Sequence, residues 1–184
     1  MKEVILSLAI SFDGMIVDEN RNYDWIVGDG NHSLNTVDQF DFSSFSQSCG
    51  VIIMGKTSFD DIPIETIEDY KNKRFIVLTH SKDKPKYENV EFYSGNLSIL
   101  VEELKNTIDK DIWIFGGSSV SNILIKTDSI SKYIIAIIPV ILGKGTRLFH
   151  DDNPKLELQL ENYSVDQGIV ILTYTRKNIN NNVI

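Results

Sequence analysis

Three short apolar runs constrain the fold of this chain more than any other feature of its sequence. They are VIIM at 51–54, FIVL at 75–78 and IWIF at 112–115. None of them has a polar face, so each predicts a strand that is covered on both sides, as in a parallel sheet between layers of helix. The runs alternate with segments of helical spacing, and the chain is therefore expected to belong to the α/β class.

Each apolar run stops at glycine or at small polar residues. Gly116 and Gly117 follow the last run and would let a ligand approach the main chain closely. Ser118 or Ser119 is expected to cap a helix over 118–126, whose first N–H groups and dipole favour an anion. Lys56 adds a positive charge after the first run. Taken alone, such a strand-to-helix turn is equally consistent with a purely structural role.

Length and charge limit the remaining possibilities. At 184 residues the chain suits one domain, expected over 1–177, with 178–184 as a flexible tail. A net charge of −8 argues against non-specific binding to nucleic acid or to anionic membranes. The single cysteine, Cys49, excludes an intramolecular disulfide and a cysteine-built metal site, and no histidine set indicates a metal. These features favour a cytoplasmic protein.

The remaining elements follow from periodicity and turn signals. Helical spacing predicts a helix over 33–48 with Ser33 as N-cap, which Asp41-Phe42-Ser43-Ser44 could break or where a second helix could start. Another helix is predicted over 97–108, capped by Asn96. The last third changes character, because two alternating stretches flank Asp166-Gln167-Gly168 and predict an antiparallel hairpin. A mixed, mostly parallel sheet results, with expected strands at 3–11, 51–54, 75–78, 90–93, 112–115, 132–138, 155–165 and 169–175.

The segments IIMGKTSF, IVLTHS and IFGGSSV, in this order and preceded by ENRNYDW, resemble the dihydrofolate reductase superfamily over nearly the whole chain. The resemblance implies a three-layer α/β/α fold with an eight-stranded sheet that binds NADPH across these strand ends. Phe12-Asp13-Gly14, the stretch 139–145 and Leu148-Phe149 look more like the reductase domain of riboflavin-biosynthesis enzymes, the RibD C-terminal domain, in its stand-alone form. That domain reduces the ribose of an aminopyrimidine phosphate with NADPH.

The resemblance also implies roles for individual residues. Lys56 stands where arginine is common and would contact the 2′-phosphate as a point charge. Phe115 would border the nicotinamide, and the Gly116–Gly117 peptide bond is typically cis. Trp25 would close the substrate side, while Lys144 and Arg147 could hold a substrate phosphate or could equally lie in a surface loop. The full set implied for the cofactor is Ala9, Ile16, Gly55, Lys56, Thr57, Ser58, Leu78, Thr79, His80, Ser81, Phe115, Gly116, Gly117, Ser118, Ser119 and Val120.

Departures from dihydrofolate reductase favour the riboflavin branch. Asp24 replaces the proline before the tryptophan, and Ser121 replaces a tyrosine after the glycine pair. The acid that holds a pterin ring has no aligned counterpart, so Asp13 is the first candidate for proton supply and Asp41 the second. Asp13 could equally cap the Asp-Gly turn.

The expected activity is NADPH-dependent hydride transfer to a C=N or C=O carbon of a small heterocyclic or ribosyl-pyrimidine-like substrate. An authentic dihydrofolate reductase and a non-catalytic NADPH-binding sensor are the alternatives. Relatives of this branch are commonly dimers, which implies a homodimer.

Overall fold

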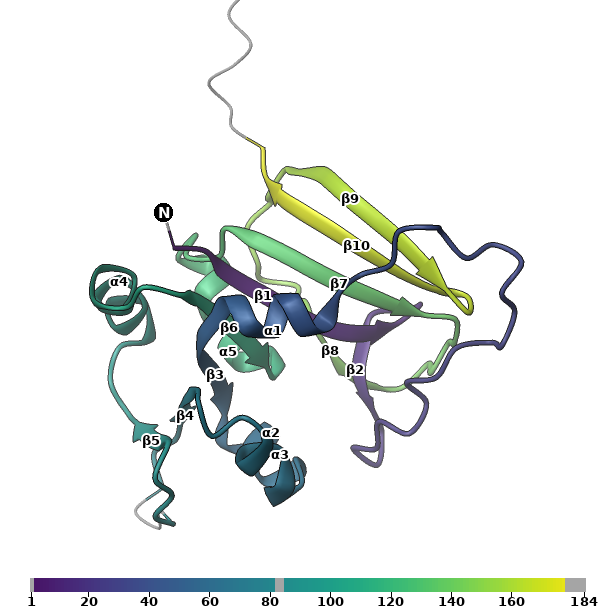
Figure 1. Cartoon of the computed structure of the whole chain (residues 1–184). Helices are drawn as coiled ribbons and strands as arrows, with labels where there is room; N and C mark the ends of the chain where they lie inside the picture. Colours follow the sequence, from purple (N-terminus) through teal and green to yellow (C-terminus); the bar gives the residue numbers. More distant parts are fainter. Residues whose placement is uncertain (1, 82–84, 178–184) are drawn as a thin grey trace, which may run out of the picture.

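The protein is built on one eight-stranded sheet, seen in a computed structural model that describes residues 2–81 and 85–177. Six strands run parallel, and the last two form an antiparallel hairpin at one edge, in which β10 runs against the six and β9 runs with them. This confirms the predicted α/β class, the mostly parallel sheet and the antiparallel C-terminal hairpin (Figure 1). In sheet order the strands are β5 (Val90–Tyr93), β4 (Arg74–Leu78), β3 (Cys49–Gly55), β6 (Asp111–Gly116), β1 (Val4–Ser11), β7 (Lys132–Ile138), β10 (Ile169–Arg176) and β9 (Leu158–Asp166).

Helices cover both faces of the sheet, as the three-layer prediction requires. One face packs against α4 and α5 through residues such as Val101 and Leu124. The other face packs against α1, α2 and α3 through Phe45, Phe59 and Ile67. Because strands β3 and β6 contribute to both clusters, their side chains are apolar without interruption. The helices are α1 (Phe42–Ser48), α2 (Lys56–Asp61), α3 (Ile64–Asp69), α4 (Leu97–Thr107) and α5 (Ser118–Lys126).

Two antiparallel pairs of strands complete the fold. A small ribbon joins β2 (Met15–Asp18) to β8 (Gly145–Arg147) beyond the end of β1. The hairpin β9–β10 turns at Gln167 and Gly168, which have φ values of 48° and 77°. Positive φ at both central residues is the conformation that matches the twist of a tight hairpin.

The prediction of a helix over 33–48 was wrong in its first half. Helix α1 begins at Phe42, because Asp41 and not Ser33 is the N-cap, with the Asp41 carboxylate accepting from Ser44 N. Residues 28–39 instead pack along the hairpin tip, where Thr36 N donates to Val165 O at 3.0 Å. Helix α3 was not predicted, and β9 begins at 158 rather than 155.

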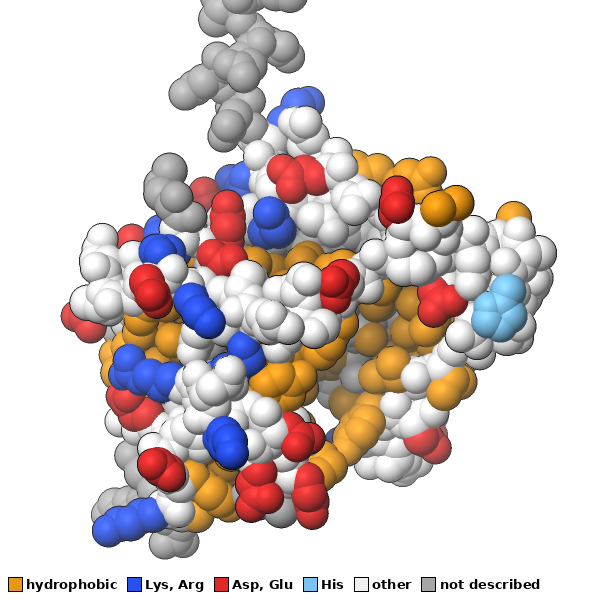
Figure 2. Space-filling model, in the orientation of Figure 1, with side chains coloured by type: hydrophobic (Ala, Val, Ile, Leu, Met, Phe, Trp, Pro, Cys, Tyr) orange, Lys and Arg blue, Asp and Glu red, His pale blue; other side chains and the backbone are white. Residues whose placement is uncertain are grey.

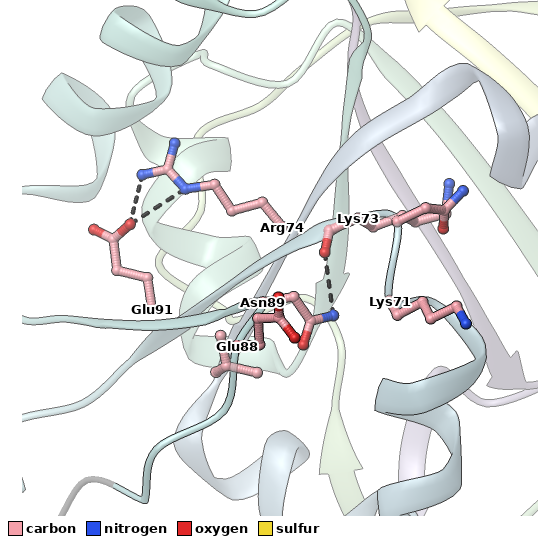
Figure 3. Close-up of a pocket in the computed structure, with 8 residues that line it drawn as sticks. Lys71, Lys73, Arg74, Glu88, Asn89 and Glu91 are labelled. Atoms are coloured by element: carbon pink, nitrogen blue, oxygen red, sulfur yellow. Dashed lines mark hydrogen bonds and ion pairs between the residues drawn. The ribbon is translucent and has the colours of Figure 1, made fainter.

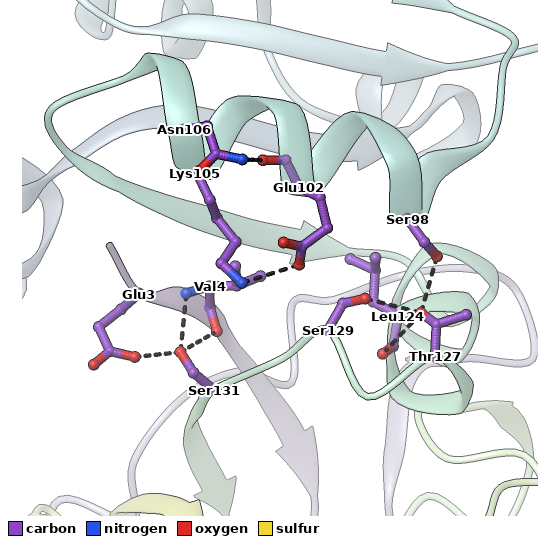
Figure 4. A network of polar contacts seen from close by, with 10 residues as sticks. All are labelled: Glu3, Val4, Ser98, Glu102, Lys105, Asn106, Leu124, Thr127, Ser129 and Ser131. Atoms are coloured by element: carbon purple, nitrogen blue, oxygen red, sulfur yellow. Dashed lines mark hydrogen bonds and ion pairs between the residues drawn. The ribbon is translucent and has the colours of Figure 1, made fainter. Parts of the chain in front are cut away.

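Polar contacts fix the start of β1 to the residue before β7, and α4 to α5 (Figure 4). The Ser131 hydroxyl accepts from Val4 N at 3.0 Å and donates to Glu3. Ser98 at the start of α4 donates to the Thr127 hydroxyl at the end of α5, at 2.9 Å. The N-cap of α4 is Asn96, as predicted, and its side chain accepts from Ser98 N and Ile99 N.

Buried Asn122 connects α5 to the segment after β8. Its amide donates to Ser118 O and Leu148 O at 2.6 and 2.7 Å, and its carbonyl accepts from His150 N at 3.0 Å. Because the hydrogen bonds of this buried amide are all made within the protein, they specify one arrangement of α5 and the segment after β8.

None of the described helices combines the length and the apolar character needed to cross a lipid bilayer.

Candidate functional site

Three strand ends meet at the side of the sheet where the parallel strands have their carboxyl ends, and this side is called the edge below. Strands β4, β3 and β6 are neighbours, with Leu78 opposite Gly55 and Met54 opposite Gly116. Because parallel strands end on the same side, the polar residues that follow them come together, although they are far apart in the sequence. This edge therefore carries most of the residues that the resemblance implies for the cofactor.

Glycine 117 lies at the centre of this edge. A β-carbon placed on Gly117 would lie 3.2 Å from Ser58 Oγ and 3.7 Å from the Ile16 side chain. Gly55 faces Val120 in the same way, at 3.5 Å. The structure thus brings together residues of β2, α2, β6 and α5. The Gly116–Gly117 peptide bond is cis, as the resemblance implies.

The helices α2 and α5 both begin at this edge. Their N-caps are Gly55 and Gly117, and neither helix receives a side-chain cap within the described residues. The expectation that Ser118 or Ser119 caps α5 was wrong, because Gly117 already occupies that position and Ser118 is buried in the first turn. Unpaired N–H groups of a first turn are suited to bind an anion.

The side chains around these helix starts differ in exposure. Lys56 Nζ lies 2.5 Å from Asp60 Oδ1, in an ion pair along α2. Thr57 and Ser119 are exposed. After β4, Thr79 is buried and its hydroxyl accepts from Ser81 N at 3.0 Å, whereas His80 is exposed. Thr79 therefore shapes this turn, and His80 is the residue presented to solvent.

The segment from Glu19 to Trp25 extends from β2 to α2. Arg21 forms an ion pair with Asp61 at 2.5 Å, and the Tyr23 hydroxyl donates to Asp61 O at 3.0 Å. Trp25 is half-buried, with Nε1 donating to Asn22 O at 3.0 Å. Arg21 and Tyr23 therefore hold this segment, which the resemblance implies for the substrate side, against the end of α2.

A sequence model of the RibD C-terminal domain matches residues 2–172. The chain is a member of the RibD C-terminal domain family. Among curated relatives, the uncharacterized protein YwjB of Bacillus subtilis is 31% identical, over 95% of this chain and 98% of its own. The uncharacterized protein YyaP of the same organism is 29% identical, over 94% of both chains.

Solved structures share the fold of this family member. A putative riboflavin biosynthesis protein from Shewanella sp. PV-4 superposes with a TM-score of 0.74 at 23% identity, covering 97% of this chain and all of its own. The diaminohydroxyphosphoribosylaminopyrimidine deaminase/5-amino-6-(5-phosphoribosylamino)uracil reductase of Thermotoga maritima superposes with a TM-score of 0.69 at 18% identity. This chain covers 57% of the length of that bifunctional protein.

Both carboxylates expected to supply a proton have structural partners in this family member. The Asp13 carboxylate accepts from Ser11 Oγ at 2.6 Å and from the N–H groups of Leu142 and Gly143 at 3.1 and 2.7 Å. These bonds, that of Ser11 first, lower the pKa of Asp13 to about 2. Bonds from Ser44 likewise hold the pKa of the helix-capping Asp41 below its usual value. Both groups are therefore ionised at neutral pH.

The two cations proposed for a substrate phosphate lie on the β2–β8 ribbon and its turn. Lys144 Nζ is 3.7 Å from Glu19, and its side chain is 80% exposed. Arg147 lies opposite Met15 and is exposed. Neither residue belongs to the edge formed by β3, β4 and β6, so a role in phosphate binding stays a prediction.

Ala136 and Ile171, which lie on the same face of the sheet as the predicted Phe115 and Ala9, were missed by sequence reasoning. Phe115 is half-buried and its ring centroid lies 5.5 Å from that of Trp113, which continues to Phe42 at 5.7 Å. On the same face Ala9 pairs with Ala136, which pairs with Ile171. The only signal for Ala136 and Ile171 was the two-residue alternation along their strands.

A separate polar pocket of about 390 Å³ lies at the opposite edge, where β4 and β5 begin (Figure 3). Arg74 pairs with Glu91 across it at 2.5 Å, and the Asn89 amide donates to Lys73 O at 3.2 Å. Its lining groups are thus largely paired with one another. None of the residues implied for the cofactor lines this pocket.

Proposed function

We propose that this protein is an NADPH-dependent reductase that transfers a hydride to a C=N or C=O carbon of a small heterocyclic, ribosyl-aminopyrimidine-like substrate. The observation that carries the proposal is the packing of Gly117 against Ser58 and Ile16 at the edge where β3, β4 and β6 end. Membership of the RibD C-terminal domain family supports it.

The residues at this edge fit a dinucleotide. The bare backbone of Gly117 packs closely on Ser58 and lies beside two helix starts, where main-chain N–H groups suit phosphate oxygens. Lys56 and the segment from Leu78 to Ser81 would hold the adenosine end with its 2′-phosphate. Phe115 would border the nicotinamide, and the backbone of Ala9 and Ile16 would meet its carboxamide.

The protein's own groups would mainly bind, orient and exclude water. Bound NADPH would supply two electrons as a hydride and leave as NADP⁺, while the substrate nitrogen or oxygen takes up one proton. Because Asp13 and Asp41 are ionised near neutral pH, we propose that this proton comes from water. The roles of the chain are then to fix the acceptor ring and to keep the wall at Arg21–Trp25 in place.

Lys56→Ala is expected to weaken NADPH binding by about tenfold or more and to leave NADH binding nearly unchanged. A charged hydrogen bond to phosphate contributes about 1.5–3 kcal/mol, and about 1.4 kcal/mol corresponds to tenfold. Fluorescence titration of both nucleotides measures the difference. Lys126→Ala is the matched control, since Lys126 is also ion-paired on a helix, with Asp152 at 2.5 Å. Equal losses for NADPH and NADH would remove Lys56 from the 2′-phosphate site.

Asp13→Asn is expected to retain turnover within about tenfold, because the carboxamide oxygen can still accept one of the two N–H bonds from the 142–143 segment. Loss of a true proton donor costs about 10²–10⁴-fold. The pH profile of kcat/KM, measured from pH 5 to 9, should have the same shape in the unchanged protein and in Asp13→Asn. A change of kcat/KM with pH that is lost in Asp13→Asn is the contrary result. Such a change would identify Asp13 as the acid.

The sign of the stability effect of Asp13 is fixed by its pKa of about 2, below the usual 3.8. Its contribution to folding is present above about pH 4 and is lost as the pH falls towards 2.

The homodimer and the cytoplasmic location stay predictions.

A further inference from the structure

One half of the sheet has an apolar face that no described helix covers. Strands β1, β7 and β10 place Ala9, Ala136 and Ile171 side by side on this face, and all three are half-buried. Phe115 ends the neighbouring strand β6 on the same face. Because two of the four side chains are single methyl groups, they form a flat apolar floor. Figure 2 shows a hollow here, lined by hydrophobic side chains.

The segment between β2 and α1 forms the wall of this hollow. It is held to α2 by Tyr23, to the hairpin tip by Thr36, and to α1 by the cap at Asp41. In Figure 1 this segment runs from β2 past the tip of β9 and β10 and back to α1. The hollow is thus bounded by the sheet floor on one side and by residues 19–41 on the other.

The wall carries exposed apolar side chains. Val37 is 99% exposed, Leu34 76% and Val27 62%. Phe42, which begins α1 directly after the wall, is 47% exposed although its ring packs on Phe45 and Trp113. Several exposed apolar side chains on one segment beside an apolar floor are typical of a binding surface.

The wall carries a net negative charge. Residues 19–41 contain five carboxylates and one arginine, and that Arg21 is ion-paired with Asp61. The floor residues carry no charge. A phosphate entering here would meet a segment of net negative charge whose one arginine is already paired, and like-charge contact is unfavourable. Lys144 and Arg147 lie on the β2–β8 ribbon, and Lys144 is paired with Glu19.

We propose that the hydride acceptor of this protein is a flat ring compound without phosphate, neutral or cationic, which lies on Ala9, Ala136 and Phe115. This inference rests on the proposed reductase function, because the floor ends at the residue that would border the nicotinamide. Within the family it separates this chain from a reductase of phosphorylated aminopyrimidines.

The test uses two compounds that differ only in phosphate, ribosylaminouracil and its 5′-phosphate. Both are titrated calorimetrically into the protein saturated with NADP⁺, which cannot donate a hydride. The unphosphorylated compound, or a cationic diaminopteridine, should bind at least about tenfold more tightly than the phosphate, given the repulsion expected from the wall. Equal or tighter binding of the phosphate would overturn the inference. So would the failure of both unphosphorylated rings to bind at millimolar concentration.

Variants locate the ring. Ala136→Trp should remove ring binding while NADP⁺ affinity stays within about twofold, because the new side chain fills the floor away from α2 and α5. Leu160→Trp, on exposed strand β9, is the matched control and should bind the ring normally. Ala136→Leu serves if the tryptophan variant does not fold. Unchanged ring binding in both Ala136 variants would exclude this floor.

The two proposals fail differently. A protein that does not bind NADP⁺ at all contradicts the reductase function, and the ring compounds are then titrated into the free protein. A protein that binds NADP⁺ but prefers the phosphorylated ring contradicts only the inference about the acceptor.

Discussion

Replacing Gly117 by valine is expected to lower NADPH affinity at least about 100-fold while the protein remains folded. The φ and ψ of Gly117, −70° and −160°, are open to any L-residue, so its backbone imposes no glycine requirement. The new side chain would instead occupy the space in front of Ser58 and Ile16, where a β-carbon alone would already come within 3.2 and 3.7 Å. Main-chain N–H groups of α5 would then be screened from a phosphate. Fluorescence titration with NADPH measures the loss.

Two controls separate occupation of the site from simple crowding. Gly55→Ala adds a methyl group at ordinary distance, 3.5 Å from Val120, and should reduce affinity by no more than about threefold. Combining Gly117→Val with Ser58→Ala removes the hydroxyl that the valine crowds. If the double variant regained normal NADPH binding, crowding of α2 would explain the loss and the cofactor would not pass over Gly117.

The sequence patterns that predicted the fold correctly are local ones. A run such as Ile112–Phe115 carries its own evidence for a two-sided buried strand, because every side chain in it is apolar. Asn96 likewise caps α4 through N–H groups only two and three residues away. The hairpin at Gln167-Gly168 is encoded by the turn residues themselves. Such elements need no knowledge of distant contacts.

Elements that depend on distant contacts were mispredicted. Residues 33–41 have helical spacing, but Asn35 and Thr36 bond to Val165 and Gln167, more than 120 residues away in the sequence. These bonds hold the chain in turns and bends along the hairpin tip, so the helix begins only at Phe42. Local spacing cannot show a competing partner of this kind.

The candidate site divides in the same way. Gly55, Lys56 and Gly117 stand out as strand-end residues, and parallel strands bring such ends together by their topology. Ala136 and Ile171 carry no functional group, and only the register of β1, β7 and β10 places them beside Ala9. The cofactor edge could therefore be predicted from motifs, whereas the acceptor floor required the structure.

Trp113→Ala is expected to lower the free energy of unfolding by about 3–5 kcal/mol, the range for removing a large buried aromatic side chain. Trp113 is 5% exposed, and its ring packs edge-on against Phe45 with centroids 5.2 Å apart. Its Nε1 donates to Ser7 O at 2.9 Å, so alanine would also leave this acceptor on β1 without the bond. Trp113→Phe should recover most of the packing and lose about 1 kcal/mol for the hydrogen bond. Urea unfolding measures both variants.

The chain's other tryptophan provides the matched control. Trp25 is half-buried in the wall segment and bonds only within it, to Asn22 O. Trp25→Ala should therefore cost less than about 1.5 kcal/mol of stability yet weaken binding of the ring compound, whereas Trp113→Phe should leave ring binding nearly intact. Because the ring of Phe115 packs on Trp113, a loss of ring binding in Trp113→Phe without loss of stability would show that the core tryptophan positions Phe115 for the acceptor. The opposite pattern assigns Trp113 to the core and Trp25 to the substrate wall.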